Sequence, residues 1–305
     1  MLRFIARRIL ETIPVLFVIV TATFFMARLA PGGPFSKERN LTPEAKAAVE
    51  AYYHLDRPLL TQYFEYLGRL VRGDLGPSYK FPRRTVNELI ADSFPVSLEL
   101  GFYALAISLI IGLSAGMLAA QKPNTLQDYI PMSFSMAGIC LPTFVLGPLL
   151  LLVFALWLQW VNASGWFTGR DRILPSLTLG IYYAAYIARL TRGGLLEILS
   201  QDFIRTARAK GASPQRILFR HSLRGGLLPV VSFLGPAAAG VITGSFVVET
   251  IFQLPGLGQF FVRAATNRDY FMVSGTVLFY AVLIISFNLA VDIVLAWLNP
   301  RQRLE

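Results

Sequence analysis

The chain has 305 residues, of which 54% are hydrophobic and only 15% are charged, and its formal net charge is +10. A soluble domain carries about 25% charged residues, so the composition excludes an ordinary globular domain, and its apolar content excludes a disordered chain. A single Cys excludes an intrachain disulfide framework, and one Cys with two His leaves almost no ligands for a metal site. We therefore expect an all-α polytopic membrane protein. Its positive charge then reflects membrane orientation and not nucleic-acid binding.

Six segments are long and apolar enough to span a bilayer as helices, and none alternates as a transmembrane strand does. The first follows Arg residues, as a signal peptide does, but no small-residue cleavage site closes it, so we expect a retained span. The third is long enough to tilt or to break at Pro142 or Pro148. The six segments are 9–30, 98–120, 132–160, 173–188, 227–252 and 273–298.

Lys and Arg residues in the short loops predict the orientation. They gather on the side of the N-terminus, above all between Arg192 and Arg224. The positive-inside rule therefore predicts a multi-pass membrane protein with both termini in the cytoplasm. Arg189 and Arg192, at the inner end of the fourth span, are expected to extend toward the membrane surface.

The segment 31–97 is too long for that rule, and we expect it to be an extracytoplasmic helical insertion. Thr42 and Pro43 form a start signal for one helix. A second helix is predicted from Pro58 to Gly73, with an apolar stripe that includes Leu60, Tyr63 and Phe64. We expect this stripe to pack on the protein's own spans and not on the membrane surface, because its polar face is not strongly basic.

The segment 192–226 carries the most information. Ser200 or Asp202 can start a short helix, and Gly211 can end it in a left-handed cap. Ser213 then caps a second helix with Pro214 at its first position, so we expect a helical hairpin at the cytoplasmic face. A basic loop commonly faces anionic lipid, but a lipid patch needs neither ordered caps nor regularly spaced small residues. We therefore favour a docking element.

This hairpin resembles the EAA loop of permease subunits of ABC importers, whose pattern is roughly E-A-A-x3-G-x9-I-x-L-P. Gly211 matches the glycine, and Ala207 is the one residue kept from the E-A-A slots. The peptide-permease branch is matched more strongly. FIRTARAKGAS at 203–213, LFRHSLRGGLLPV at 218–230 and GSFVVETIFQLPGLGQ at 244–259 look like it, as do RRILETIPVLF at 7–17, RLAPGGPF at 28–35, GDLGPSYK at 73–80 and NRDY at 267–270.

The resemblance covers essentially the whole chain and is closest to the B-type membrane subunit of oligopeptide permeases, followed by the dipeptide type. It implies one transmembrane domain of type I importer architecture over 1–305, placed in the bacterial inner membrane. It also implies a related C-type permease, two cytoplasmic ATPases that hold ATP and Mg, and an extracytoplasmic peptide-binding protein. It places the coupling to the ATPases on Arg205, Thr206, Ala207, Arg208, Ala209, Lys210 and Gly211.

The chain contains no G-x-x-x-x-G-K-[ST] phosphate-binding loop, so we expect no ATP hydrolysis and no cofactor on this subunit. Gly112–Gly116 fits the G-x-S-x-G pattern of hydrolases, but it lies inside a span, and both His residues are predicted to lie outside the membrane. We expect helix packing there and at Gly240–Gly244. The chain is therefore predicted to have no catalytic residue.

Glu249 and Asp292 are ionisable groups inside apolar spans, which makes each a functional candidate. Glu249 is predicted near the outer end of its span, within reach of water, as a gate or a structural hydrogen-bonding group. Asp292 lies toward the inner end of the last span and is expected to pair with a neighbouring helix. The two acids also keep an ion-coupled secondary transporter open as an alternative. Dipeptides, haem-like ligands and nickel chelates are alternative cargoes, and the residues that bind the cargo are not identified by the sequence.

Overall fold

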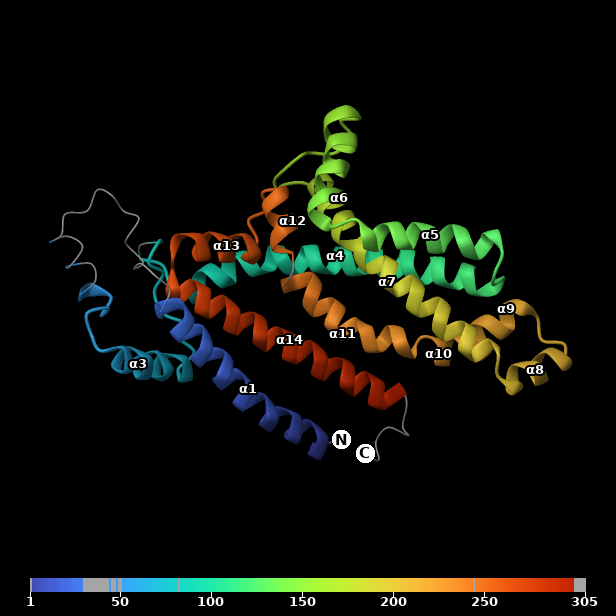
Figure 1. The fold of residues 1–305 in the computed structure, drawn as a ribbon, viewed down its shortest axis with the longest axis horizontal. Coiled ribbons are helices and arrows are strands. Elements are labelled where there is room, and N and C mark those ends of the chain that lie inside the picture. Colours follow the sequence, from blue (N-terminus) through green and yellow to red (C-terminus); the bar gives the residue numbers. More distant parts are fainter. Residues whose placement is uncertain are drawn as a thin grey trace. The chain divides into compact units, whose positions relative to one another are not determined.

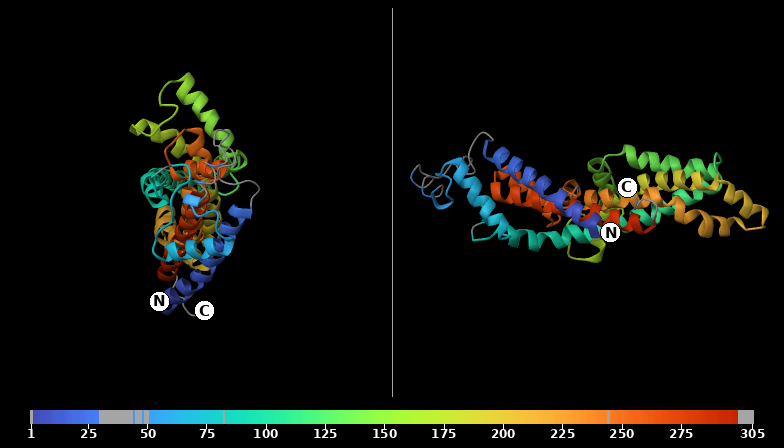
Figure 2. Two further views of the ribbon diagram at one scale, coloured as in Figure 1. Left: turned by 90° about the vertical axis from the view of Figure 1, so that its left-hand side faces the viewer. Right: turned by 90° about the horizontal axis from the view of Figure 1, so that it is seen from below.

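The computed structural model describes residues 2–29, 44, 48, 51–81, 83–243 and 245–298. Within these ranges all regular elements are helices, and β-type pairing is limited to one isolated bridge between Pro77 and Thr85. The all-α prediction is confirmed (Figure 1 and Figure 2). In the described part of the chain, five helices are long and apolar enough to cross a membrane. They are Leu10–Leu29, Val86–Gln121, Gly169–Leu199, Leu228–Ile251 and Tyr270–Leu295.

The third predicted span is a broken one. Helix α5 (Leu126–Cys140) is followed by α6 (Thr143–Leu150) and the π-helix η1 (Leu151–Trp157), and the chain bends by 106° between them. The break that the sequence allows within 132–160 therefore occurs, and the helical chain begins earlier than predicted, at Leu126. Proline disfavours a helical conformation in the residue before it, and Leu141 is extended directly before Pro142. Of the two breaks that the sequence allows, the one at Pro142 occurs, whereas Pro148 lies inside α6.

Other boundaries also differ from the prediction. Helix α4 (Val86–Gln121) begins well before residue 98, so the end of the expected insertion already belongs to the second span. The fifth span consists of α11 (Leu228–Thr243) and α12 (Phe246–Ile251). Helix α3 (Leu59–Val71) has Pro58 as its N-cap, and Gly73 follows with a φ of +76°, close to prediction. The helix start expected at Thr42 and Pro43 lies outside the described residues.

The chain divides into two compact units, which we describe separately. The larger contains Val96–Pro255 and the chain from Ile284 onward, and the smaller contains Leu2–Pro95 and Gly256–Leu283. In the larger unit, α7 (Ile173–Leu199) is the central helix and contacts α5, α6, α11 and α12. A Cβ on Gly112 of α4 would lie 2.7 Å from the Ala184 carbonyl oxygen of α7, and one on Gly116 would lie 2.6 Å from that of Ala188. The packing interpretation of the Gly112–Gly116 pattern is thus confirmed.

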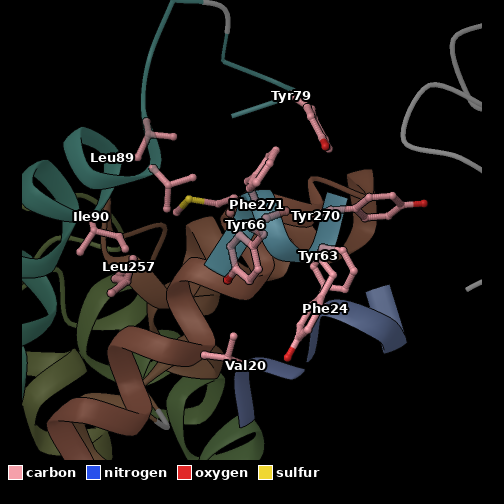
Figure 3. Packing of buried hydrophobic residues seen from close by; sticks show 13 residues of the cluster. Val20, Phe24, Tyr63, Tyr66, Tyr79, Leu89, Ile90, Leu257, Tyr270 and Phe271 are labelled. Atoms are coloured by element: carbon pink, nitrogen blue, oxygen red, sulfur yellow. The ribbon is translucent and has the colours of Figure 1, made fainter. Parts of the chain in front are cut away.

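The smaller unit is built around an aromatic cluster, which Figure 3 shows at close range. Tyr63 and Tyr66 of α3 are buried against Phe24 of α1 (Leu2–Leu29). Burial raises the pKa of the Tyr66 phenol to about 12, so the phenol stays neutral. The stripe on α3 therefore packs on the protein only in part, because Leu60 and Phe64 on the same helix are exposed.

A buried carboxylate joins two of the family-like sequence stretches in this smaller unit. Asp269 precedes α14 (Tyr270–Leu298), after α13 (Leu257–Asn267), and is 1% exposed. It accepts hydrogen bonds from the Ser78 hydroxyl and, at 3.1 Å, from the Tyr79 backbone amide. The stretches GDLGPSYK and NRDY thus form one structural feature, although many residues separate them in sequence.

Candidate functional site

The predicted hairpin is present in the larger unit. It consists of α8 (Asp202–Ala209), α9 (Pro214–Arg216), the π-helix η3 (Ile217–Ser222) and α10 (Leu223–Gly226). Figure 1 shows α8 and α9 beyond the ends of α4, α5 and α7. The hairpin is therefore presented outward at the end of the helices that carry it.

The C-terminus of α8 is closed by backbone hydrogen bonds. The Gly211 amide donates to the Arg208 carbonyl at 2.9 Å, and the Ala212 amide donates to the Ala207 carbonyl at 3.1 Å. This pair of bonds with a left-handed residue between them is a Schellman motif. Gly211 has a φ of +77°, a conformation in which any Cβ is strained, so the predicted role of this glycine in the cap is confirmed.

The second helix of the hairpin also starts as predicted. The Ser213 hydroxyl accepts from the Arg216 amide at 3.3 Å, and Pro214 occupies the first helical turn, where no amide is needed. The start of α8 differs: its N-cap is Gln201, which makes no side-chain cap bond, and not Ser200 or Asp202. Asp202 instead lies in the first turn, where a negative charge interacts favourably with the helix dipole.

The outer face of α8 is polar and basic. Arg205, Thr206, Ala209 and Lys210 are exposed, whereas Ile204 is fully buried. Arg205 forms an exposed ion pair with Asp202 at 3.3 Å. Asp202 is the one acid from residue 201 to residue 226, so the hairpin offers an acidic partner a positive surface.

Two close backbone approaches fix the hairpin to α7. A Cβ on Gly194 of α7 would lie 2.2 Å from the Gly226 carbonyl oxygen of α10. A Cβ on Gly226 would lie 2.7 Å from the Leu195 side chain and 3.1 Å from the Leu195 Cα. Movement of the hairpin therefore requires movement of α7 or a change in this contact, because packed backbones do not deform continuously.

A buried ion pair ties the same end of α7 to α5. The Arg192 guanidinium donates from Nε and Nη2 to the two carboxylate oxygens of Asp128, at 2.6 and 2.7 Å. Asp128 is 1% exposed and also accepts from the Asn124 amide at 2.9 Å. The structure thus gives Arg192 a partner that the sequence did not reveal, because the buried carboxylate holds its guanidinium in a bidentate pair.

A separate polar cluster surrounds Glu249, which lies on α12 and is completely buried. Its Oε1 accepts from the Ser97 hydroxyl of α4 at 2.8 Å and from the Ser245 hydroxyl at 2.5 Å. The expectation of water access is wrong for this chain, since these side chains and the apolar cluster that includes Val248 and Phe252 enclose the carboxylate. Asp292 lies on α14 and is partly buried.

The structure thus assembles the coupling residues on one hairpin and places Glu249 in a different cluster. Sequence analysis missed Asp128, Ser97 and Ser245. Asp128 had one usable signal, because it stands in the first turn of α5, where an acid commonly bonds to the helix start. In the described ranges, no group of three His, Cys, Asp or Glu is placed to hold a metal ion.

Comparison with known families matches two adjoining models. Residues 112–304 match "Binding-protein-dependent transport system inner membrane component", and residues 1–101 match the N-terminal model of such membrane components. The oligopeptide transport system permease protein OppB of Salmonella typhimurium is 53% identical over 305 residues, covering 99% of this chain and 100% of that protein. The dipeptide transport system permease protein DppB of Bacillus subtilis is 42% identical over 305 residues, covering 100% of this chain and 99% of that protein.

Solved structures agree on the fold. An inward-facing form of the MetNI methionine ABC transporter is similar with a TM-score of 0.59 at 18% identity, over 69% of this chain and 96% of that chain. An amino acid ABC transporter is similar with a TM-score of 0.51, also at 18% identity, over 70% of this chain and 94% of that chain. At this identity the likeness concerns the fold alone, which is that of the permease subunits of type I importers.

Proposed function

This chain belongs to the family of inner membrane components of binding-protein-dependent transport systems, and on that basis we propose that it forms half of the translocation pore of an ATP-driven oligopeptide importer. The single observation that carries the cargo assignment is the 53% identity to an oligopeptide permease over the full length of both chains. The match includes the extracytoplasmic segment, the spans and the hairpin. An importer of unrelated cargo would share the fold without sharing half of its residues along the whole chain.

The proposed subunit works with a second, C-type permease, two cytoplasmic ATPases and an extracytoplasmic peptide-binding protein, all in and around the lipid bilayer. ATP and Mg are bound by the ATPases in this scheme, and this chain contributes no catalytic group. The absence of a phosphate-binding loop from the sequence supports this division of labour. Both termini are placed in the cytoplasm, on the same side as the ATPases.

Coupling is proposed to occur through the hairpin. The exposed face of α8 presents Arg205, Thr206 and Ala209, and small residues permit close approach to a groove in the ATPase. The exposed basic residues Arg205 and Lys210 then pair with acidic groups around that groove. Because close backbone contact and the Asp128–Arg192 pair hold the hairpin on α7 and α5, a push on α8 is passed to the broken third span. The proposed coupling set is Arg205, Thr206, Ala207, Arg208, Ala209, Lys210 and Gly211.

Glu249 is proposed to hold α12 against α4 near the pathway, and its charge to contribute to the gate. The support is its complete burial together with two serine donors, one of which lies on another span. An intramembrane acid with such partners is a functional candidate by default. For Asp292 we propose a structural role on α14, consistent with its partly buried position.

Uptake by the reconstituted complex tests the proposed function. The four membrane and ATPase subunits are placed in proteoliposomes, the binding protein is added outside, and uptake of a labelled pentapeptide is followed. We expect uptake that needs ATP in the lumen and the binding protein outside, and that persists when proton and sodium gradients are collapsed. Uptake that follows an ion gradient without the ATPases would contradict the proposal and favour a secondary transporter.

Dipeptides are the second candidate cargo, because the dipeptide permease of Bacillus subtilis is 42% identical over the whole chain. The same proteoliposomes discriminate the two candidates. Unlabelled tripeptides to pentapeptides are expected to compete with the labelled pentapeptide, whereas dipeptides compete at least tenfold more weakly. The opposite order of competition would assign the dipeptide class.

A further inference from the structure

A cavity of about 480 Å³ lies between α8 and the ends of two spans in the larger unit. Gln121, the last residue of α4, and Leu199, the last residue of α7, form one side, and hairpin residues form the other. The lining contains two cations, Lys122 and Arg208, and no acidic side chain. Its size falls in the range of about 300–1,000 Å³ that small-molecule sites occupy.

The charge of this cavity is not neutralised from within. Neither Lys122 nor Arg208 has an acidic partner among the residues that the structure describes. Two cations at one cavity repel each other and attract an anion, more strongly where the surroundings exclude water. The bound group is therefore expected to carry negative charge.

Apart from Gln121 and Gln215, the rest of the wall is apolar. Ile217 and Leu218 are buried in it, and Phe219 is 59% exposed although it stands in a strongly basic segment. A small soluble anion gains nothing from such a wall. A phospholipid has both a phosphate for the cations and acyl carbons for Leu199 and Phe219.

The position of the cavity agrees with the depth of a lipid headgroup. Gln121 directly follows the predicted span 98–120, so the cavity lies beside the inner end of that span. Basic pockets between spans at the cytoplasmic side bind anionic headgroups. Figure 1 shows that α8 and α9 continue beyond the ends of α4 and α7.

The ATPase is the competing occupant, and the geometry of α8 argues against it. Arg208 lines the cavity, although it is itself exposed, and it stands four residues after the fully buried Ile204, whereas Arg205 and Ala209 do not line the cavity. The exposed face, with Arg205 and Ala209, is the one proposed to meet the ATPase. A partner on that face leaves the cavity behind α8 free for lipid.

We propose that this cavity binds the headgroup of an anionic phospholipid of the cytoplasmic leaflet. Lys122 and Arg208 hold the phosphate, and the apolar wall contacts the first acyl carbons. The bound lipid braces α8 against the end of α4 and so makes coupling depend on anionic lipid. The choice of leaflet rests on the proposed function.

Native mass spectrometry of the purified complex, in detergent with added phosphatidylglycerol or phosphatidylcholine, tests this site. We expect the wild type to retain phosphatidylglycerol in preference to phosphatidylcholine. The double variant Lys122→Gln/Arg208→Gln is expected to retain it at least threefold less. Ala212→Phe fills the cavity without changing charge and is expected to lose it as well. The matched control Arg220→Gln/Arg224→Gln removes the same charge from residues that do not line the cavity and should retain it.

Equal retention by wild type and the Lys122/Arg208 variant would overturn the proposal. A photo-crosslinker at Gln215 that reacts with the ATPase and not with lipid would overturn it too. Retention is read on the purified protein whether or not peptide uptake is observed, so failure of the lipid site and failure of the proposed function are separate outcomes.

Discussion

The hairpin and the Glu249 cluster belong to the same unit but are shaped by different means. The hairpin depends on backbone geometry: a left-handed Gly211 closes α8, and Gly194 lets α10 lie against α7. The Glu249 cluster depends on side chains, since its carboxylate is held by Ser97 and Ser245. The first arrangement is suited to passing on a displacement as a rigid piece. The second changes when a single charge or hydroxyl is removed.

The largest effect is expected at the contact between α7 and α10. Gly194→Val would drive a Cβ into the Gly226 carbonyl, which cannot move aside as a side chain does, and we expect a loss of about 3 kcal/mol of stability. Thermal unfolding of the purified protein in detergent measures this loss. Gly193→Ala is the matched control, because a Cβ there meets nothing within 4 Å. Equal melting temperatures for the two variants would mean that the backbone contact between Gly194 and Gly226 does not limit which side chain fits there.

The ion pair between α5 and α7 comes next. Asp128→Ala leaves the partly buried Arg192 without its carboxylate, and we expect a loss of about 2 kcal/mol, below the value for a fully buried pair because Arg192 keeps some exposure. Transport should fall more than ATP hydrolysis, because the hairpin loses a link to the third span. The swap Asp128→Arg/Arg192→Asp is expected to recover part of the stability. If the swap recovers no stability and the Asp128→Ala variant still couples ATP hydrolysis fully to transport, the ion pair has no role in passing movement from the hairpin to the third span.

These two predictions show what the sequence can and cannot supply. The hairpin was predictable because its signals are local: Gly211, Ser213 and Pro214 act on neighbouring backbone groups. The break at Pro142 was foreseen as a possibility for the same reason. The Asp128–Arg192 pair was missed because its members are 64 residues apart, and a basic residue at a span end has a satisfactory alternative in the lipid headgroups.

Long-range partners explain the remaining differences. Glu249 was recognised as a candidate, but Ser97 lies 152 residues away and no local pattern connects them. Asp269 shows the same limit in the smaller unit, where it joins two sequence stretches that were noticed separately. The apolar stripe of α3 was predicted to pack on the protein's own spans, yet Leu60 and Phe64 are exposed while Tyr63 and Tyr66 join the aromatic cluster.

A smaller effect is expected in the Glu249 cluster. Glu249→Gln keeps an acceptor for Ser97 and Ser245 while removing the charge, so we expect little change in stability and reduced uptake if the charge serves the gate. Ser97→Ala is the matched control, because it removes one hydrogen bond and keeps the charge, at a cost of about 1 kcal/mol. Wild-type uptake by the Glu249→Gln variant would limit this residue to a structural role.

A modest change in stability is expected at Gly211. Its Cβ position is open, so a substitution is opposed by backbone conformation alone, at about 1–2 kcal/mol for Val and less for Asn, which tolerates the left-handed region. Gly211→Val should weaken coupling by distorting the end of α8, whereas Gly211→Asn should retain most of it. The ratio of peptide transported to ATP hydrolysed measures the difference. Similar ratios for both variants would mean that this cap is not needed for coupling.

The most direct test of the central claim is a membrane pull-down on this chain, comparing the wild type with Ala207→Arg, which places a large charged side chain among the small residues of α8. We expect the wild-type chain to recover both a second permease and the ATPases. We expect the Ala207→Arg chain to remain in the membrane, to recover the permease and to lose most of the ATPase. Full ATPase recovery by Ala207→Arg would contradict the assignment of α8 as the coupling helix.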